Sequence, residues 1–153
     1  MREGFNVLRE AAPAVPDAGI EKVHSNARVA PDAPAHIQDI RSNRVTHPGE
    51  LRLEVASGAM TRLEGVSRVL GGAEGIHLAI ATIPPGCQSS PHRHTNCESA
   101  IYVVRGHGRF LTGERLDRVL EVGPGDFIYV PPMAVHAPVS EGPEPLELVV
   151  ARN

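Results

Sequence analysis

Three histidines and one glutamate have the types and the spacing that could bind a divalent metal ion. His92 and His94 stand two residues apart in the segment PHRHTNCE, and Glu98 follows four residues after His94. Residues two apart on a β-strand face the same side, so both imidazoles could reach one ion. His136 lies in the later segment VPPMAVHAPV and completes the set if a neighbouring strand places it opposite the pair. Imidazole nitrogens with a carboxylate oxygen suit Fe, Mn, Zn or Ni as divalent ions.

The remaining histidines and both cysteines are weaker candidates. A single histidine is usually a surface or packing residue, and we expect this of His24, His36, His47 and His107. His77 belongs to an apolar run and is expected to pack or to line a pocket. A thiolate at Cys97 would be a strong soft ligand, but packing as a small hydrophobic residue is favoured for it and for Cys87. Two cysteines do not make a disulfide framework, so we expect free thiols.

Composition excludes several classes of protein. A chain of 153 residues is long enough for one domain with a core, and 41% hydrophobic and 22% charged residues are ordinary for a globular protein. The formal net charge of -3 and the lack of a basic stripe argue against nucleic acid as a partner. No apolar run approaches the roughly 20 residues that span a bilayer, and the N-terminus lacks the apolar stretch of a signal peptide. We therefore expect a cytoplasmic protein that does not bind membranes.

Two regions of the chain differ in character. Residues 1–45 are rich in alanine and proline and keep no apolar period, so they are predicted to form an extended N-terminal arm. Residues 46–153 are predicted to form one domain, because short runs of Val, Ile and Leu alternate there with glycine and proline turns. Many short strands at close spacing indicate an all-β sandwich or barrel. The predicted strands are 51–56, 60–66, 76–83, 98–105, 107–112, 116–121, 126–131, 134–139 and 146–151.

The two histidine segments resemble the two sequence motifs of the cupin family. In the first motif a glycine precedes an HxH pair, and a glutamate and a second glycine follow it. In the second motif a glycine and a proline precede a histidine. The residues that carry the resemblance are Gly86, His92, His94, Glu98 and Gly106 in the first motif, and Gly125, Pro131 and His136 in the second. Met133 stands where the second motif usually has glycine, and Ser140 where it usually has asparagine.

The resemblance implies a fold, a ligand set and an assembly. Its fold is the cupin double-stranded β-helix, a jelly-roll-like barrel, here with an extended N-terminal arm. Carried over residue by residue, the ligands of one divalent transition metal per chain would be His92, His94, Glu98 and His136. The family also implies a homodimer, and the arm could cross between its subunits.

The orientation of Glu98 has two interpretations. The family's glutamate stands one residue closer to the following tyrosine-valine pair than Glu98 stands to Tyr102. Strict alternation would therefore turn Ser99 to the metal face and Glu98 away from it. A β-bulge near Asn96 would return Glu98 to the interior, and we favour it because a buried cation attracts a carboxylate. The alternative is a three-histidine site with Glu98 on its rim.

Several functions are compatible with such a site. A metal-dependent enzyme acting on a small organic substrate is favoured, and oxygenase chemistry is its leading form because open coordination positions can bind both O2 and substrate. One alternative is isomerase, lyase or cyclase chemistry with the metal as a Lewis acid. Two further alternatives are a non-catalytic ligand-binding module and a structural barrel whose metal is incidental. Phe127 and Tyr129 share one strand face, as do Arg109 and Leu111 on another, and either pair could line the pocket.

Overall fold

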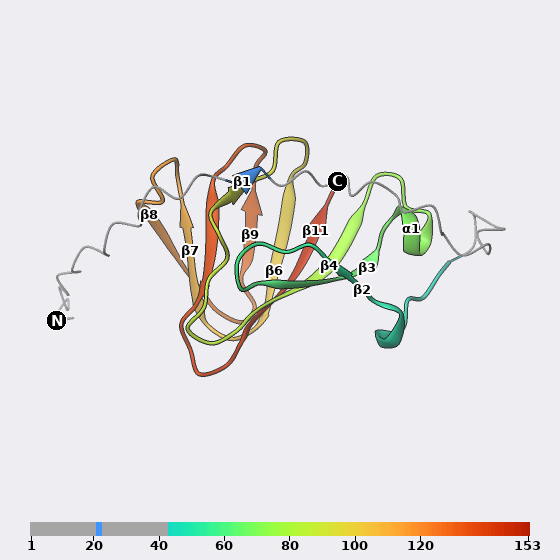
Figure 1. Ribbon diagram of the computed structural model, residues 1–153, viewed down its shortest axis with the longest axis horizontal. Coiled ribbons are helices and arrows are strands. Elements are labelled where there is room, and N and C mark those ends of the chain that lie inside the picture. Colours follow the sequence, from blue (N-terminus) through green and yellow to red (C-terminus); the bar gives the residue numbers. More distant parts are fainter. Residues whose placement is uncertain (1–20, 23–42) are drawn as a thin grey trace, which may run out of the picture.

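Two β-sheets that face each other make up the fold (Figure 1). The computed structural model describes residues 21–22 and 43–153, so most of the predicted arm lies outside the described residues. Within the described part, the predicted all-β class is confirmed, and the few helical segments are single turns. No helix in this part of the chain is long and apolar enough to cross a membrane.

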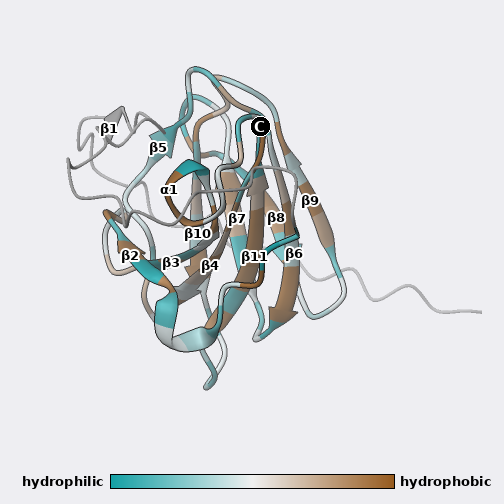
Figure 2. Ribbon diagram, turned by 90° about the vertical axis from the view of Figure 1, so that its right-hand side faces the viewer, coloured by the Kyte–Doolittle hydropathy of each residue, from teal (hydrophilic) through white to brown (hydrophobic). Residues whose placement is uncertain are grey.

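The larger sheet has six strands in the order β2-β3-β4-β11-β6-β9. All of its neighbouring strands are antiparallel. Strand β11 lies between β4 and β6 and pairs with both. Its outer edge at β9 is largely hydrophobic (Figure 2). The bounds are β2 (Arg52–Glu54), β3 (Thr61–Val66), β4 (His77–Ile83), β6 (Ser99–Arg105), β9 (Phe127–Val130) and β11 (Leu146–Arg152).

The smaller sheet has five strands in the order β1-β5-β10-β7-β8. The two-residue strand β1 pairs in parallel with β5, so one short piece of the N-terminal region lies against the histidine segment. The other pairings are antiparallel. The bounds are β1 (Glu21–Lys22), β5 (His92–Arg93), β7 (Gly108–Thr112), β8 (Arg118–Val122) and β10 (His136–Ser140).

Each of the nine predicted strands overlaps an observed strand whose ends differ by at most two residues. The elements that sequence periodicity did not predict are short: β1, β5, a 3-10 turn η1 (Pro48–Glu50) and a helix α1 (Arg68–Gly71). Helix α1 begins because the Ser67 side chain accepts hydrogen bonds from two backbone N–H groups, and it ends at Gly72, which is left-handed. Segments of two to four residues are too short for a hydrophobic period to be recognised.

The core lies between the sheets and follows from strict alternation. On β11 every second residue is buried, so Leu146, Leu148 and Val150 pack inward, and Arg152 follows on the same face. Ile101 and Val103 on β6 also point inward, and they join the same hydrophobic cluster. Most of the inward positions are apolar and stabilise the sandwich by burial. Some of the polar exceptions, His92, His136 and Arg152 among them, line the pocket described next.

Candidate metal centre

His92, His94 and His136 converge inside the sandwich. His92 begins β5 and His136 begins β10, and the antiparallel pairing of these strands sets the two residues directly opposite each other. All three side chains are buried, and one ring nitrogen from each lies within 4.8 Å of the others. The ring centroids of His92 and His136 are 4.3 Å apart, and those of His94 lie 5.2 and 5.5 Å from the two. The structure therefore unites the three histidines that the sequence singled out.

Backbone carbonyls orient two of the imidazoles. Nδ1 of His92 lies 2.8 Å from the carbonyl oxygen of Ser90, and Nδ1 of His136 lies 3.0 Å from that of Ala134. A carbonyl can only accept, so each Nδ1 carries the hydrogen and each Nε2 keeps its lone pair. Histidines that bind metals are usually held in this way by a second hydrogen bond.

His94 has a different neighbour. Nη2 of Arg152 lies 2.9 Å from Nε2 of His94. A guanidinium has donors and no acceptor, so Arg152 donates this hydrogen bond and the ring nitrogen accepts it. Nδ1 of His94 is buried and has no hydrogen-bond partner among the described residues. The ring thus has one orphaned nitrogen and one that is shared with a cation, and this is a polar environment that a metal ion could complete.

Burial keeps the imidazoles of His94 and His136 neutral. It lowers the pKa of His136 to about 4 and, with the Arg152 charge as the next contribution, it lowers the pKa of His94 to about 3. Metal ions bind the deprotonated ring, so protons do not compete strongly for either side chain at neutral pH. The three imidazoles, two at the starts of paired strands and one directly after β5, fit a divalent transition metal by donor type and by spacing.

Glu98 does not join the histidines. Its side chain is exposed, and its carboxylate accepts a hydrogen bond from the hydroxyl of Tyr129 at 2.8 Å, which raises the pKa of that tyrosine. Ser99 is buried instead, and from Ser99 onward β6 pairs in unbroken register with β9. The favoured prediction that a bulge turns Glu98 inward is therefore corrected: alternation along β6 points Glu98 to the outer face.

We expect Glu98→Gln to leave metal affinity within about threefold of the wild type, below the roughly 10–100-fold that even outer-shell changes cost at metal sites. The physical reason is that its carboxylate is on the outer face of β6 and contacts Tyr129. Competition with a chelator measures the affinity. A loss of tenfold or more would mean that Glu98 reaches the ion after all.

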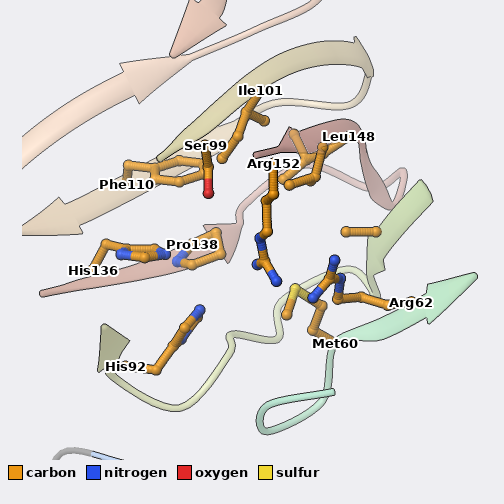
Figure 3. A pocket seen from close by; sticks show the side chains of 12 residues that line it. Met60, Arg62, His92, Ser99, Ile101, Phe110, His136, Pro138, Leu148 and Arg152 are labelled. Carbon is orange, nitrogen blue, oxygen red and sulfur yellow. The ribbon is translucent and has the colours of Figure 1, made fainter. Parts of the chain in front are cut away.

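A pocket lies beside the histidines and is lined by side chains of both sheets. Figure 3 shows His92 and His136 on one side, Arg62 on the other, and the guanidinium of Arg152 reaching in between them. Sequence reasoning did not identify either arginine. Alternation along β3 and β11 was the available signal, because it places each one on the face of buried neighbours.

Neither residue pair proposed from the sequence lines this pocket. Phe127 and Tyr129 are 82% and 62% exposed on the outer face of β9. On β7, Arg109 forms an ion pair with Glu141, whereas the neighbouring Phe110 is the residue that lines the pocket. The short strand β7 buries two successive residues, Phe110 and Leu111, so simple alternation fails there.

A second group of possible ligands, Glu54, Glu64 and His77, is better explained as an ion-pair network. Nε2 of His77 lies 2.9 Å from one oxygen of Glu54, and Nη2 of Arg62 lies 3.2 Å from the other. Burial alone would raise the pKa of Glu54, but the His77 hydrogen bond and the Arg62 charge lower it below its usual value. His77 therefore pairs with a carboxylate at the outer end of this network, and Glu54 supports Arg62.

The two cysteines are free thiols, as predicted. Cys97 is buried and Cys87 is half-buried against the core. Neither cysteine belongs to a group of possible metal ligands among the described residues.

Met133, which replaces the usual glycine of the second motif, keeps the backbone conformation that a glycine would favour. Its φ is 67°, in the left-handed region that costs a side-chain-bearing residue roughly 1–3 kcal/mol. Its N–H donates to the carbonyl oxygen of His94 at 2.7 Å. The strained turn thus ties the segment before His136 to the HxH pair.

Comparisons with known proteins agree with this fold. Residues 79–152 match a family described as a cupin domain, so the chain is a cupin-domain protein of the cupin superfamily. It is 34% identical over 73 residues to an uncharacterized protein of Methanocaldococcus jannaschii, a match that covers 47% of this chain and 55% of the relative. The chain thus spans about half the length of the curated relative it matches.

Two solved structures illustrate the range of its structural relatives. The polyketide cyclase RemF from Streptomyces resistomycificus has a TM-score of 0.61 and 23% identity, with 72% of this chain and 78% of that chain covered. An oxalate decarboxylase from Lactobacillus farciminis, solved with formate, has a TM-score of 0.60 and 27% identity. The match covers 69% of this chain and 32% of the decarboxylase chain. The cupin fold predicted from the two motifs is confirmed, whereas such distant likenesses do not assign an activity.

Proposed function

We propose that this cupin is a metal-dependent enzyme that acts on a small organic substrate, with one divalent ion held by His92, His94 and His136. The observation that best supports this proposal is the set of three buried imidazoles, each with a ring nitrogen within 4.8 Å of the others. A divalent ion in such a site acts as a Lewis acid that polarises an oxygen atom of the substrate. The cyclase and the decarboxylase among the structural relatives support chemistry on small organic molecules.

The charge of the site favours Lewis-acid chemistry, as in isomerases, lyases and cyclases, over the oxygenase chemistry favoured from the sequence. Imidazoles are neutral ligands, and Glu98 lies on the outer face, so an ion held by the three histidines would keep its full charge. The Arg152 guanidinium stands beside His94 and adds positive charge. Nearby cations make the loss of an electron from the ion more costly, but they stabilise negative charge that develops on a substrate oxygen.

The remaining side chains of the pocket are suited to keep water out. Ile101, Phe110 and Leu148 are buried and line it between the histidines and the arginines. Phe110 also lies almost parallel to the His136 ring, with the centroids 6.3 Å apart. Apolar walls lower the local dielectric and so strengthen each electrostatic interaction with the substrate.

The proposal is tested by metal content and then by reaction. Elemental analysis of purified protein, and of protein reconstituted with Fe(II), Mn(II), Zn(II) and Ni(II), is expected to show close to one ion per chain. Loaded protein is then assayed for oxygen uptake and, under nitrogen, for turnover of diketones and small acids. Turnover without oxygen is expected. Failure to retain any of the four metals would refute the proposed centre, and strict dependence on oxygen would restore the oxygenase interpretation.

We also propose a homodimer, which the family resemblance implies. Apolar side chains gather on the outer face of β6 and β9, where Tyr102 and Phe127 are exposed and their ring centroids are 4.9 Å apart. Exposed apolar patches of this kind often mark contacts between chains. Phe127→Glu is expected to convert a dimer into a monomer in sedimentation experiments, because it places a charge in the contact. A wild-type monomer at micromolar concentration would refute the dimer.

A further inference from the structure

Two arginines are buried next to the metal centre, and one of them forms no ion pair with a carboxylate of the described residues. Arg152 is 8% exposed and Arg62 is 4% exposed. Arg62 lies beside the Glu54 carboxylate, but Arg152 makes its hydrogen bond to the neutral ring of His94, and no carboxylate among the described residues pairs with it. The Glu54 charge acts on Arg152 only weakly, as a smaller contribution than burial and than the like charge of Arg62. Burying a cation without a close anionic partner is unfavourable, so the position of Arg152 indicates a ligand that brings negative charge.

Unsatisfied donors of three residues are directed into the same pocket. Nε of Arg152, Nε of Arg62 and the hydroxyl of Ser99 are buried without a hydrogen-bond partner among the described residues. All three residues line the pocket, and Ser99 is the register partner of Arg152 across β6 and β11. Buried polar atoms in native proteins are nearly always paired, so a cluster of orphaned donors indicates a ligand that supplies acceptors.

The position of Arg152 connects this cluster to the metal centre. Its Nη2 is 2.9 Å from Nε2 of His94, so an anion bound to this guanidinium would lie next to an ion held by the histidines. A guanidinium keeps its charge at neutral pH, so Arg152 can attract an anion. A planar guanidinium matches the two oxygens of a carboxylate.

We propose that Arg152, assisted by Arg62 and Ser99, forms a carboxylate-binding subsite, so that the substrate of the proposed enzyme is a small carboxylate anion. That the bound carboxylate is a substrate rests on the proposed function, whereas carboxylate binding by these residues does not. Arg152 is the better placed of the two for an anion, because Arg62 forms an ion pair with Glu54 and Arg152 forms none among the described residues. The bound carboxylate would draw Arg152 away from His94 and leave Nε2 of that ring available as a ligand atom.

The test measures binding of defined probes to the full chain after removal of metal by a chelator. Calorimetric titrations use acetate, malonate and succinate, with malonamide as the neutral counterpart of malonate. We expect at least one carboxylate to bind, and malonamide to bind at least about tenfold more weakly, because hydrogen bonds to charged groups are the stronger ones.

Variants then assign the binding to the subsite. Arg152→Gln is expected to weaken carboxylate binding by about tenfold or more, since it removes the charge. Arg152→Lys keeps the charge but loses the planar fork, and it is expected to weaken binding severalfold; it also serves as the test if the glutamine variant does not fold. Arg118→Gln, at an exposed arginine on β8, is the matched control and is expected to bind like the wild type.

Two results would overturn the subsite: no binding of any of the three carboxylates to the wild type, or equal binding to the wild type and the Arg152 variants. A parallel titration with Zn(II) separates this from the proposed function. Zinc binding without carboxylate binding refutes the subsite alone, and carboxylate binding without zinc binding refutes the metal centre alone.

Discussion

Replacing His92 and His94 together by alanine is expected to abolish metal binding while the sandwich stays folded. The two residues supply two of the three buried ring nitrogens that lie within 4.8 Å of one another. Loss of direct ligands should exceed the roughly 10–100-fold that outer-shell changes cost, so the affinity for Zn(II) should fall by more than about 100-fold. The fold should survive because the hydrophobic cluster, and not an ion, supplies most of the stability in a core of this size.

The matched control removes the same number of imidazoles elsewhere. His47 and His107 are exposed, and the double variant His47→Ala, His107→Ala is expected to keep the wild-type affinity. Zinc affinity is measured by competition with a chelator, and folding by circular dichroism. Retention of tight zinc binding by the His92, His94 variant would refute the centre. Wholesale loss of the β signal in that variant would show that these side chains are structural.

Leu146→Ala is expected to destabilise the protein by about 2–5 kcal/mol, the usual cost of truncating a buried leucine. Leu146 is 0% exposed at the start of β11, and it belongs to the core cluster between the sheets. Removing its side chain leaves a cavity that the surroundings cannot fill, because β11 is hydrogen-bonded to β4 and β6 on both sides. Urea denaturation measures the change in the free energy of unfolding.

The same substitution at Leu53 provides the comparison. Leu53 is 73% exposed on β2, which forms an edge of the six-stranded sheet, so Leu53→Ala is expected to change stability by no more than about 0.5 kcal/mol. Equal losses for the two variants would contradict the assignment of the core. Metal affinity is expected to be unchanged in both, since neither side chain lines the pocket beside the histidines.

The strands and the histidine site could be predicted because both depend on local spacing. Turn residues bound the apolar runs, and the predicted strand ends agree with the observed ones to within two residues. His92 and His94 are two apart, which puts them on one face, and the motif around His136 implied that it lies opposite them. Periodicity and short motifs are properties of neighbouring residues, so they are visible without the fold.

The environment of the site could not be predicted, because it depends on contacts between residues far apart in the chain. Arg152 reaches His94 across 58 positions of sequence, through the pairing of β11 with β6. Glu98 was assigned to the metal from the motif, yet the register of β6 with β9 points it outward toward Tyr129. A shift of one residue in register reverses the face of every side chain.

By itself, the sequence determined the strands, because alternation and turn chemistry act over a few residues, and the resemblance of its two motifs to the cupin family implied the fold and the three histidines. Tertiary structure decided that Ser99 and not Glu98 faces the interior, and that two arginines enter the pocket. These outcomes follow from the order in which strands pair within the two sheets, and from the burial that this order imposes on each charged group. The charge of the site, and hence the chemistry proposed for it, therefore depends on the folded arrangement.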